Sequence, residues 1–255
     1  MRPYLIATLL AAVLLTIIHQ STSQAEPPKP SMTKGDVETI VKEYLINNPE
    51  VVVDALDAYS KEQERLEQEA AKKAIEENKE SLFNNPLAPS IGPADADVVI
   101  AEFFDYHCGY CKRMIPVINK LMEDDQKVRV VFHELPILSK DSRLAAKAAL
   151  AVYQLNPKQY FAYHTVLMKA SGKYTKEMLT KEAVKLGVDK AKFTDALDMK
   201  QLDNALKSSK ELASKVGISG TPAFVIGDEL IPGASSLERI KKIVAKQRKA
   251  NAAKN

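Results

Sequence analysis

The chain has 255 residues, of which 36 are basic and 33 acidic, so its formal net charge at neutral pH is only +3. This balance gives no electrostatic reason to expect a nucleic-acid partner. A chain of this length buries a sizeable core without disulfides, so its two cysteines are available for chemistry.

The N-terminus has the pattern of a secretory signal peptide. Arg2 supplies a positive charge, residues 5–18 form an apolar stretch, and Ala25 ends a small-x-small cleavage site. The apolar stretch is shorter than the roughly 20 residues that span a bilayer, and a retained membrane anchor is the alternative interpretation. We therefore expect residues 1–25 to be removed near Ala25 and the mature protein to reach an envelope space such as the bacterial periplasm.

Residues 26–83 predict a helical N-terminal region. Thr33 and Asp36 resemble a capping box before a short amphipathic helix. A second helix is expected to start with Asn48 as its N-cap and to continue to Asn84, because no glycine or proline interrupts it. Its apolar residues approximate alternating spacings of three and four: Val52, Leu56, Tyr59, Leu66 and Ala70. This pattern predicts coiled-coil-like self-association, with a solvated helical stalk as the alternative.

From residue 84 onward the pattern indicates an α/β domain. Two apolar runs rich in β-branched and aromatic residues, 97–104 and 127–136, predict buried strands, with a helix from about 109 to 123 between them. Residues 139–216 predict several helices, because the helical pattern is broken near Pro157, Gly172 and Gly187.

The C-terminal part predicts a hairpin and a last helix. Gly227 and Asp228 form a hairpin turn signal between two short strands. Ser235 and Glu238 are expected to cap the final amphipathic helix. The order of the elements therefore predicts an α/β fold with an inserted helical subdomain at about 139–216.

Cys108 and Cys111 are expected at the junction of the first strand and its helix. A zinc site needs a second pair of ligands, and the sequence shows none. A c-type haem needs histidine after Cys111, where Lys112 stands. The start of a helix favours a thiolate at Cys108, because unsatisfied backbone N–H groups and the positive end of the helix dipole point at the sulfur. We expect no metal and no cofactor, and a redox role in which Cys111 attacks the mixed disulfide that Cys108 forms.

Two motifs then resemble one family. The segment "AEFFDYHCGYCKRMIP" resembles the active-site segment of thioredoxin-fold thiol-disulfide interchange proteins of the Dsb type, including the proline five residues beyond the second cysteine, here Pro116. The segment "GISGTPAFVIG" resembles the cis-proline strand of that family. The resemblance covers about residues 96–250. It implies a thioredoxin fold with an inserted α-helical subdomain over residues 84–255, preceded by a helical oligomerisation region.

The resemblance implies a role for the segment around Pro222. A cis bond before Pro222 would bring the backbone of Thr221 beside Cys108, where it can pair with an extended substrate. The alternative is an ordinary trans turn before a strand.

The resemblance also implies roles for the neighbours of the cysteines. His107, Gly109 and Tyr110 are expected to tune the stability of the thiolate, although the histidine or the tyrosine can simply pack. Glu102 resembles the acid beneath the cysteines that relays a proton to Cys111. A strand residue that faces solvent is the alternative for Glu102.

The dipeptide Gly109-Tyr110 and the threonine before Pro222 differ from the Pro-His and Val typical of DsbA-like oxidases, and they resemble disulfide isomerases of the DsbC and DsbG type. An N-terminal oligomerisation helix before such a domain resembles relatives of the suppressor-of-copper-sensitivity protein ScsC. These likenesses imply a homodimeric or homotrimeric isomerase or oxidoreductase that acts on unfolded or misfolded secreted proteins and has a membrane redox partner. A monomeric DsbA-type thiol oxidase is one alternative, and a copper-binding or surface protein on the same scaffold is the other.

Overall fold

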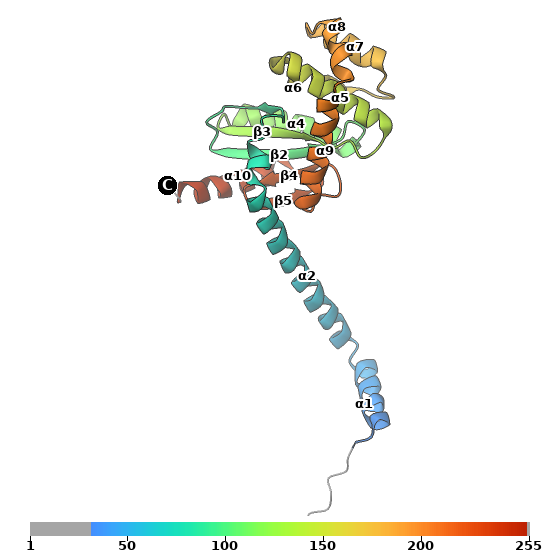
Figure 1. Ribbon diagram of the computed structural model, residues 1–255. Coiled ribbons are helices and arrows are strands. Elements are labelled where there is room, and N and C mark those ends of the chain that lie inside the picture. The colour runs from blue at the N-terminus through green and yellow to red at the C-terminus, as the bar shows by residue number, and fades with distance from the viewer. Residues whose placement is uncertain (1–31, 254–255) are drawn as a thin grey trace, which may run out of the picture. The chain divides into compact units, whose positions relative to one another are not determined.

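A computed structural model describes residues 32–253 (Figure 1). The expected signal peptide, residues 1–25, lies outside the described residues. Among residues 32–253 no helix combines the length and the apolar character needed to cross a membrane. The described residues divide into two compact units, one that ends at Ala58 and one that begins at Tyr59.

The first helix confirms the predicted capping box. In α1 (Lys34–Asn47) the N–H of Asp36 donates to Thr33 Oγ1 at 3.3 Å, and the N–H of Thr33 donates to Asp36 Oδ2 at 2.9 Å. Asn48 is the C-cap of α1, since its N–H donates to the carbonyl oxygen of Tyr44. It is not the N-cap of the next helix, because that helix starts at Glu50 and the side-chain amide of Asn48 also donates to the Tyr44 carbonyl oxygen. The apolar side chains of α1 are all exposed in the described part of the chain: Val37, Ile40, Val41, Tyr44, Leu45 and Ile46.

The second helix, α2 (Glu50–Glu77), ends earlier than the sequence predicts. The helix breaks at Asn78, whose side-chain amide donates to the carbonyl oxygen of Ala74 at 2.8 Å. Such a local hydrogen bond competes with helix continuation. A short helix, α3 (Lys79–Phe83), follows. Three side chains of this region are buried in the core of the second unit: Ile75, Leu82 and Phe83. That unit therefore begins before residue 84, where the sequence pattern placed the domain boundary.

A mixed five-stranded sheet forms the centre of the second unit, in the order β1-β3-β2-β4-β5. The strands are β1 (Ser90–Ile91), β2 (Val98–Phe104), β3 (Val128–Glu134), β4 (Ala223–Ile226) and β5 (Glu229–Pro232). β2 and β3 are parallel and are joined by α4 (Gly109–Asp124), whereas β4 is antiparallel to both β2 and β5. The two strands, the helix between them and the hairpin confirm the sequence prediction. β1 was not predicted, since two residues are too short to leave a pattern.

Alternate residues of β2 face two separate cores. Val98, Ile100 and Phe104 pack in a core that also contains buried residues of α4 and of the helical insert. Ala101 and Phe103 pack on the opposite face. Because side chains of a strand alternate between faces, Glu102 points into the same core as α4.

The helical insert contains five α-helices: α5 (Lys140–Leu155), α6 (Tyr160–Lys169), α7 (Lys176–Lys185), α8 (Lys190–Leu197) and α9 (Lys200–Lys215). The three predicted breaks are confirmed, and a further break separates α8 from α9. Figure 1 shows α5 to α8 gathered beyond one face of the sheet. The last helix, α10 (Leu237–Ala252), is capped by Ser236, whose Oγ accepts the N–H of Arg239 at 3.2 Å. The prediction of Ser235 as the cap is therefore wrong by one residue, because Ser236 has the extended backbone that lets its side chain reach that N–H.

Candidate active site

Both cysteines lie at the start of α4, as the sequence predicts. Cys108 is the N-cap residue, and its Sγ accepts the N–H of Cys111 at 3.3 Å. Cys108 retains 6% of its surface, whereas Cys111 is fully buried. Both are free thiols. A protein substrate approaching from outside therefore meets the sulfur of Cys108 first.

A second segment reaches Cys108 from a distant part of the chain. The Thr221–Pro222 peptide bond is cis, so the alternative of an ordinary trans turn is wrong. The thiol of Cys108 donates to the carbonyl oxygen of Thr221 at an Sγ–O distance of 3.2 Å. The carbonyl oxygen of Pro222 accepts the N–H of Gly233 at 2.8 Å, which ties this segment to the end of β5. A backbone polar group thus lies beside the sulfur of Cys108.

The residues between the cysteines face solvent. Tyr110 is 58% exposed, and the guanidinium of Arg113 lies 4.0 Å from the centroid of its ring. A Cβ added at Gly109 would point into open space. Apart from the immediate neighbours of Gly109, no atom of residues 32–253 lies within 4 Å of that position. These two residues therefore form part of the accessible surface beside Cys108.

His107 packs instead of facing solvent. Its ring lies edge-on against Tyr174, with 4.8 Å between the ring centroids. Its backbone N–H donates to Asp105 Oδ1 at 2.7 Å. The alternative of a packing role thus describes its position, and the predicted tuning of the thiolate stays a prediction.

Asp105 is a site residue that the sequence reasoning missed. Its carboxylate is 1% exposed and accepts four hydrogen bonds, from the N–H groups of His107, Ile137 and Leu138 and from the hydroxyl of Ser142, at 2.6 to 2.9 Å. It thereby joins the segment before Cys108 to the loop before α5. The available signal was an acidic residue directly after a buried strand.

Glu102 is buried beneath the cysteines. It is 2% exposed, so the alternative of a residue facing solvent is wrong. Burial raises the pKa of Glu102 to about 8. Burial also raises the pKa of the Cys111 thiol well above its ordinary value, and the nearby charge of Glu102 adds to this shift. A buried thiol must lose its proton to a neighbouring base before it can attack, and an acid whose pKa lies near neutrality suits that task.

A second buried carboxyl lies on the same face of the sheet and was also missed. The hydroxyls of Tyr106 and Tyr160 donate to Glu134 Oε1 at 3.0 and 3.3 Å. The Tyr106 hydroxyl also lies 3.1 Å from His164 Nδ1. Burial raises the pKa of Glu134 well above its usual range, and burial lowers the pKa of His164 to about 3, so His164 is neutral at neutral pH. The strand also contains Arg129 and His133, so the acidic residue at its end carried no signal of burial.

A cysteine pair at the start of a helix after the central strand, opposite a cis-proline segment, defines a thiol-disulfide oxidoreductase of the thioredoxin fold. The comparison with family models agrees. The model described as the DSBA-like thioredoxin domain matches residues 99–245, so the chain belongs to the DsbA-like thioredoxin family. The model described as the copper resistance protein ScsC N-terminal domain matches residues 34–65.

Individual relatives extend this result. The thiol:disulfide interchange protein DsbA of Bordetella pertussis is 30% identical over 152 residues, which are 56% of this chain and 68% of that protein. The crystal structure of Proteus mirabilis ScsC in a transitional conformation is 30% identical, covers 85% of this chain and 97% of that chain, and has a TM-score of 0.63. The structure of Salmonella enterica Typhimurium BcfH is 26% identical, covers 84% of this chain and 95% of that chain, and has a TM-score of 0.73. Both structural matches include more residues than the unit 59–255, so the likeness extends into the N-terminal helices.

Proposed function

We propose that this protein rearranges protein disulfides in the periplasm, through Cys108 and Cys111, as an oligomeric disulfide isomerase with oxidoreductase activity. The observation that supports this most directly is the geometry at Cys108. Its sulfur lies 3.3 Å from the N–H of Cys111 and 3.2 Å from the carbonyl oxygen of Thr221. The start of a helix favours a negative sulfur, and the partly buried backbone of Thr221 beside Cys108 can pair with an extended chain.

The exchange starts at Cys108. Its thiolate attacks one sulfur of a wrong disulfide in an unfolded or misfolded secreted protein, and the other substrate sulfur leaves as a thiolate. In isomerisation, a different substrate thiolate then attacks the substrate sulfur of the mixed disulfide. Cys108 is released again as a thiolate, and no net oxidation occurs.

Cys111 provides the exit from a stalled mixed disulfide. Its thiol transfers a proton to the carboxylate of Glu102, and its sulfur attacks that of Cys108. The bond between Cys108 and the substrate breaks, so the substrate leaves reduced and the enzyme carries a Cys108–Cys111 disulfide. A membrane redox partner, which we propose to be a reductase, must then reduce this disulfide before the next cycle.

The N-terminal helices supply the proposed assembly. The apolar side chains of α1 are exposed, and so are Val52, Leu56 and Tyr59 in the first half of α2. We propose that these residues associate with the same residues of one or two further copies to form a homodimer or homotrimer. The match of residues 34–65 to the ScsC N-terminal domain supports a separate role for this segment.

Refolding of scrambled ribonuclease tests both the role of Cys108 and the role of the N-terminal helices. We expect the full chain to restore ribonuclease activity and a Cys108→Ser variant to fail. A chain that starts at residue 59 is the suitable truncation, because it removes α1 but keeps Ile75, Leu82 and Phe83 in the core. Equal isomerase activity of this truncation would refute the role of the N-terminal helices.

A monomeric DsbA-type oxidase is the second candidate, favoured by the match of residues 99–245 to the DSBA-like domain. Alkylation of Cys108 and Cys111 in cells separates the two, since an isomerase must be kept reduced and an oxidase oxidised. Copper binding is a third candidate, because the family matched by residues 34–65 is described as a copper resistance protein. Stoichiometric copper that is lost in Cys108→Ser would support it.

A further inference from the structure

The two buried glutamates, Glu102 and Glu134, lie on neighbouring strands. The parallel register pairs Glu102 with Phe132 and Phe104 with Glu134, so the glutamates are two positions apart on the same face of β2 and β3. The usual spacing and rise of strands place their Cα atoms roughly 8 Å apart. Two glutamate side chains can span that separation. Both are nearly inaccessible, with 2% and 3% of their surfaces exposed.

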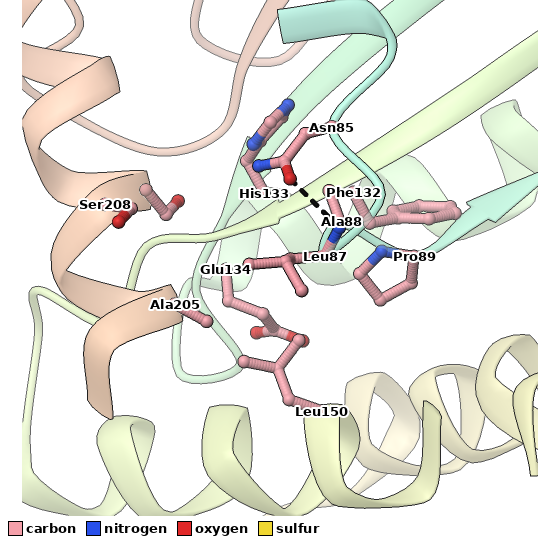
Figure 2. Close-up of a pocket in the computed structure, with 11 residues that line it drawn as sticks. Asn85, Leu87, Ala88, Pro89, Phe132, His133, Glu134, Leu150, Ala205 and Ser208 are labelled. Atoms are coloured by element: carbon pink, nitrogen blue, oxygen red, sulfur yellow. Dashed lines mark hydrogen bonds between the residues drawn. The ribbon is translucent and has the colours of Figure 1, made fainter. Parts of the chain in front are cut away.

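A small cavity lies beside Glu134 (Figure 2). It has a volume of about 30 Å³ and is bounded by the end of β3, by α5 and α9, and by the segment 85–89. This volume is enough for at least one water molecule. Within the described part of the chain, two polar atoms of its lining residues are buried, with less than 1 Å² accessible, and have no hydrogen-bond partner: Oε2 of Glu134 and Oγ of Ser209. Oε2 therefore meets a water in the cavity only when the Glu134 side chain rotates toward it. At its outer side Leu87 is half exposed, so the cavity lies close to bulk solvent.

The surroundings of Glu134 decide where its proton sits. The titratable side chains that face this region are Glu102, Asp105, Tyr106, His133, Tyr160 and His164. None of them is a cation at neutral pH, since burial lowers the pKa of His133 to about 4 and that of His164 to about 3. The remaining lining residues of α5, α9 and segment 85–89 carry no charge. Burial without a facing cation therefore favours the protonated form of Glu134. Because its Oε1 already accepts bonds from two tyrosines, the proton sits on Oε2.

We propose that Glu134 and this cavity are the route by which the buried redox site exchanges protons with solvent. This inference rests on the proposed function, because the proton moves only when Cys111 resolves a mixed disulfide. Cys111 gives its proton to Glu102 as the Cys108–Cys111 bond forms and the substrate thiolate leaves. Glu134 then releases its Oε2 proton to water in the cavity and takes up the proton from Glu102. One proton reaches solvent, Glu102 is again a carboxylate, and Glu134 is again protonated.

Glu134 touches no sulfur in this scheme and acts through Glu102. Its effect must therefore appear in the resolution step and not in the first attack. Mixing the reduced full chain with an aromatic disulfide that releases a coloured thiolate, such as dithiobis(nitrobenzoate), separates the two steps. The first thiolate is released when Cys108 attacks, and the second when Cys111 closes the disulfide.

The informative variant is Glu134→Gln, because the amide has the same shape but cannot pass a proton on. We expect its first phase to match wild type and its second phase to be slower by about tenfold, less than the full contribution of a direct acid or base. In wild type the second phase should rise with pH as Glu102 ionises, and in Glu134→Gln this rise should flatten, since proton exit becomes limiting. Glu134→Asp, which keeps an acid, should recover most of the rate.

A second variant tests the cavity without changing Glu134. Ala205→Leu places a larger side chain into the cavity and should slow the second phase in the same way. This variant still tests the proton route if Glu134→Gln does not fold. Ser214→Ala, on the exposed side of the same helix, is the matched control and should match wild type.

The outcomes are distinguishable. The proton route would be overturned if Glu134→Gln and Ala205→Leu both kept the second-phase rate and pH profile of wild type. It would also be overturned if these variants slowed both phases equally. Either result would leave the proposed function intact. Release of only one thiolate by wild type would instead overturn the role of Cys111.

Discussion

Replacement of Glu102 by glutamine should stabilise the protein, by an amount that increases with pH. The folded protein holds the pKa of this carboxyl at about 8, against an ordinary value of 4.5, because burial disfavours the charged form. The folded state thus binds a proton that the unfolded state loses at lower pH. The contribution of Glu102 is most favourable below pH 4.5 and is lost progressively as the pH rises to about 8.

The magnitude follows from the two pKa values. Ionisation of Glu102 lowers the free energy of unfolding of wild type relative to its value in acid. The loss is about 1 kcal/mol at pH 5, about 3 kcal/mol at pH 7 and about 5 kcal/mol at pH 9. Glutamine does not titrate, so the difference in stability between Glu102→Gln and wild type should grow by about 4 kcal/mol between pH 5 and pH 9. Any loss of packing by the amide is the same at every pH and does not affect this slope.

Urea unfolding at several pH values measures the difference directly. The protein must be kept reduced, because the raised pKa of Glu102 belongs to the state in which both cysteines are free thiols. Comparing the variant with wild type cancels the titrating groups that do not feel the charge of Glu102. A stability difference that stays constant from pH 5 to pH 9 would show that Glu102 is not held in an environment that opposes its charge.

Three further changes test the packing of the site. A chain starting at residue 84 should be less stable in urea than one starting at residue 59 by about 6 kcal/mol, because it lacks three buried apolar side chains; equal stabilities would place those residues outside the core. Asp105→Ala should lower the unfolding free energy by more than about 3 kcal/mol, since it removes the acceptor of four buried hydrogen bonds; a loss below about 1 kcal/mol would contradict those contacts. Gly92→Ala should lower the melting temperature more than Gly172→Ala does. Both glycines have positive φ, but only at Gly92 would a Cβ overlap the backbone of β3. Similar losses in the two variants would show that this backbone gives way.

The local features of the fold could be predicted because neighbouring residues determine them. The capping box of Thr33 and Asp36, the helix that starts after Cys108 and the turn at Gly227 each depend on a few adjacent residues. The positions of helix ends were predicted less exactly, because neighbouring residues can each cap or end a helix. Ser236, not Ser235, caps the last helix, and the amide of Asn78 ends α2 before the expected boundary.

By itself the sequence determined the position of the cysteine pair at the junction of strand and helix, and it indicated the segment at Pro222 that lies beside Cys108. Only the tertiary structure decided which acids are buried with that pair. Glu102 fits a strand facing solvent as well as one facing a core, and Glu134 has no local signal of burial at all. The reason is physical. The proton affinity of a carboxyl depends on whether distant segments remove it from water, and here α4 and the helical insert do so from positions far along the chain.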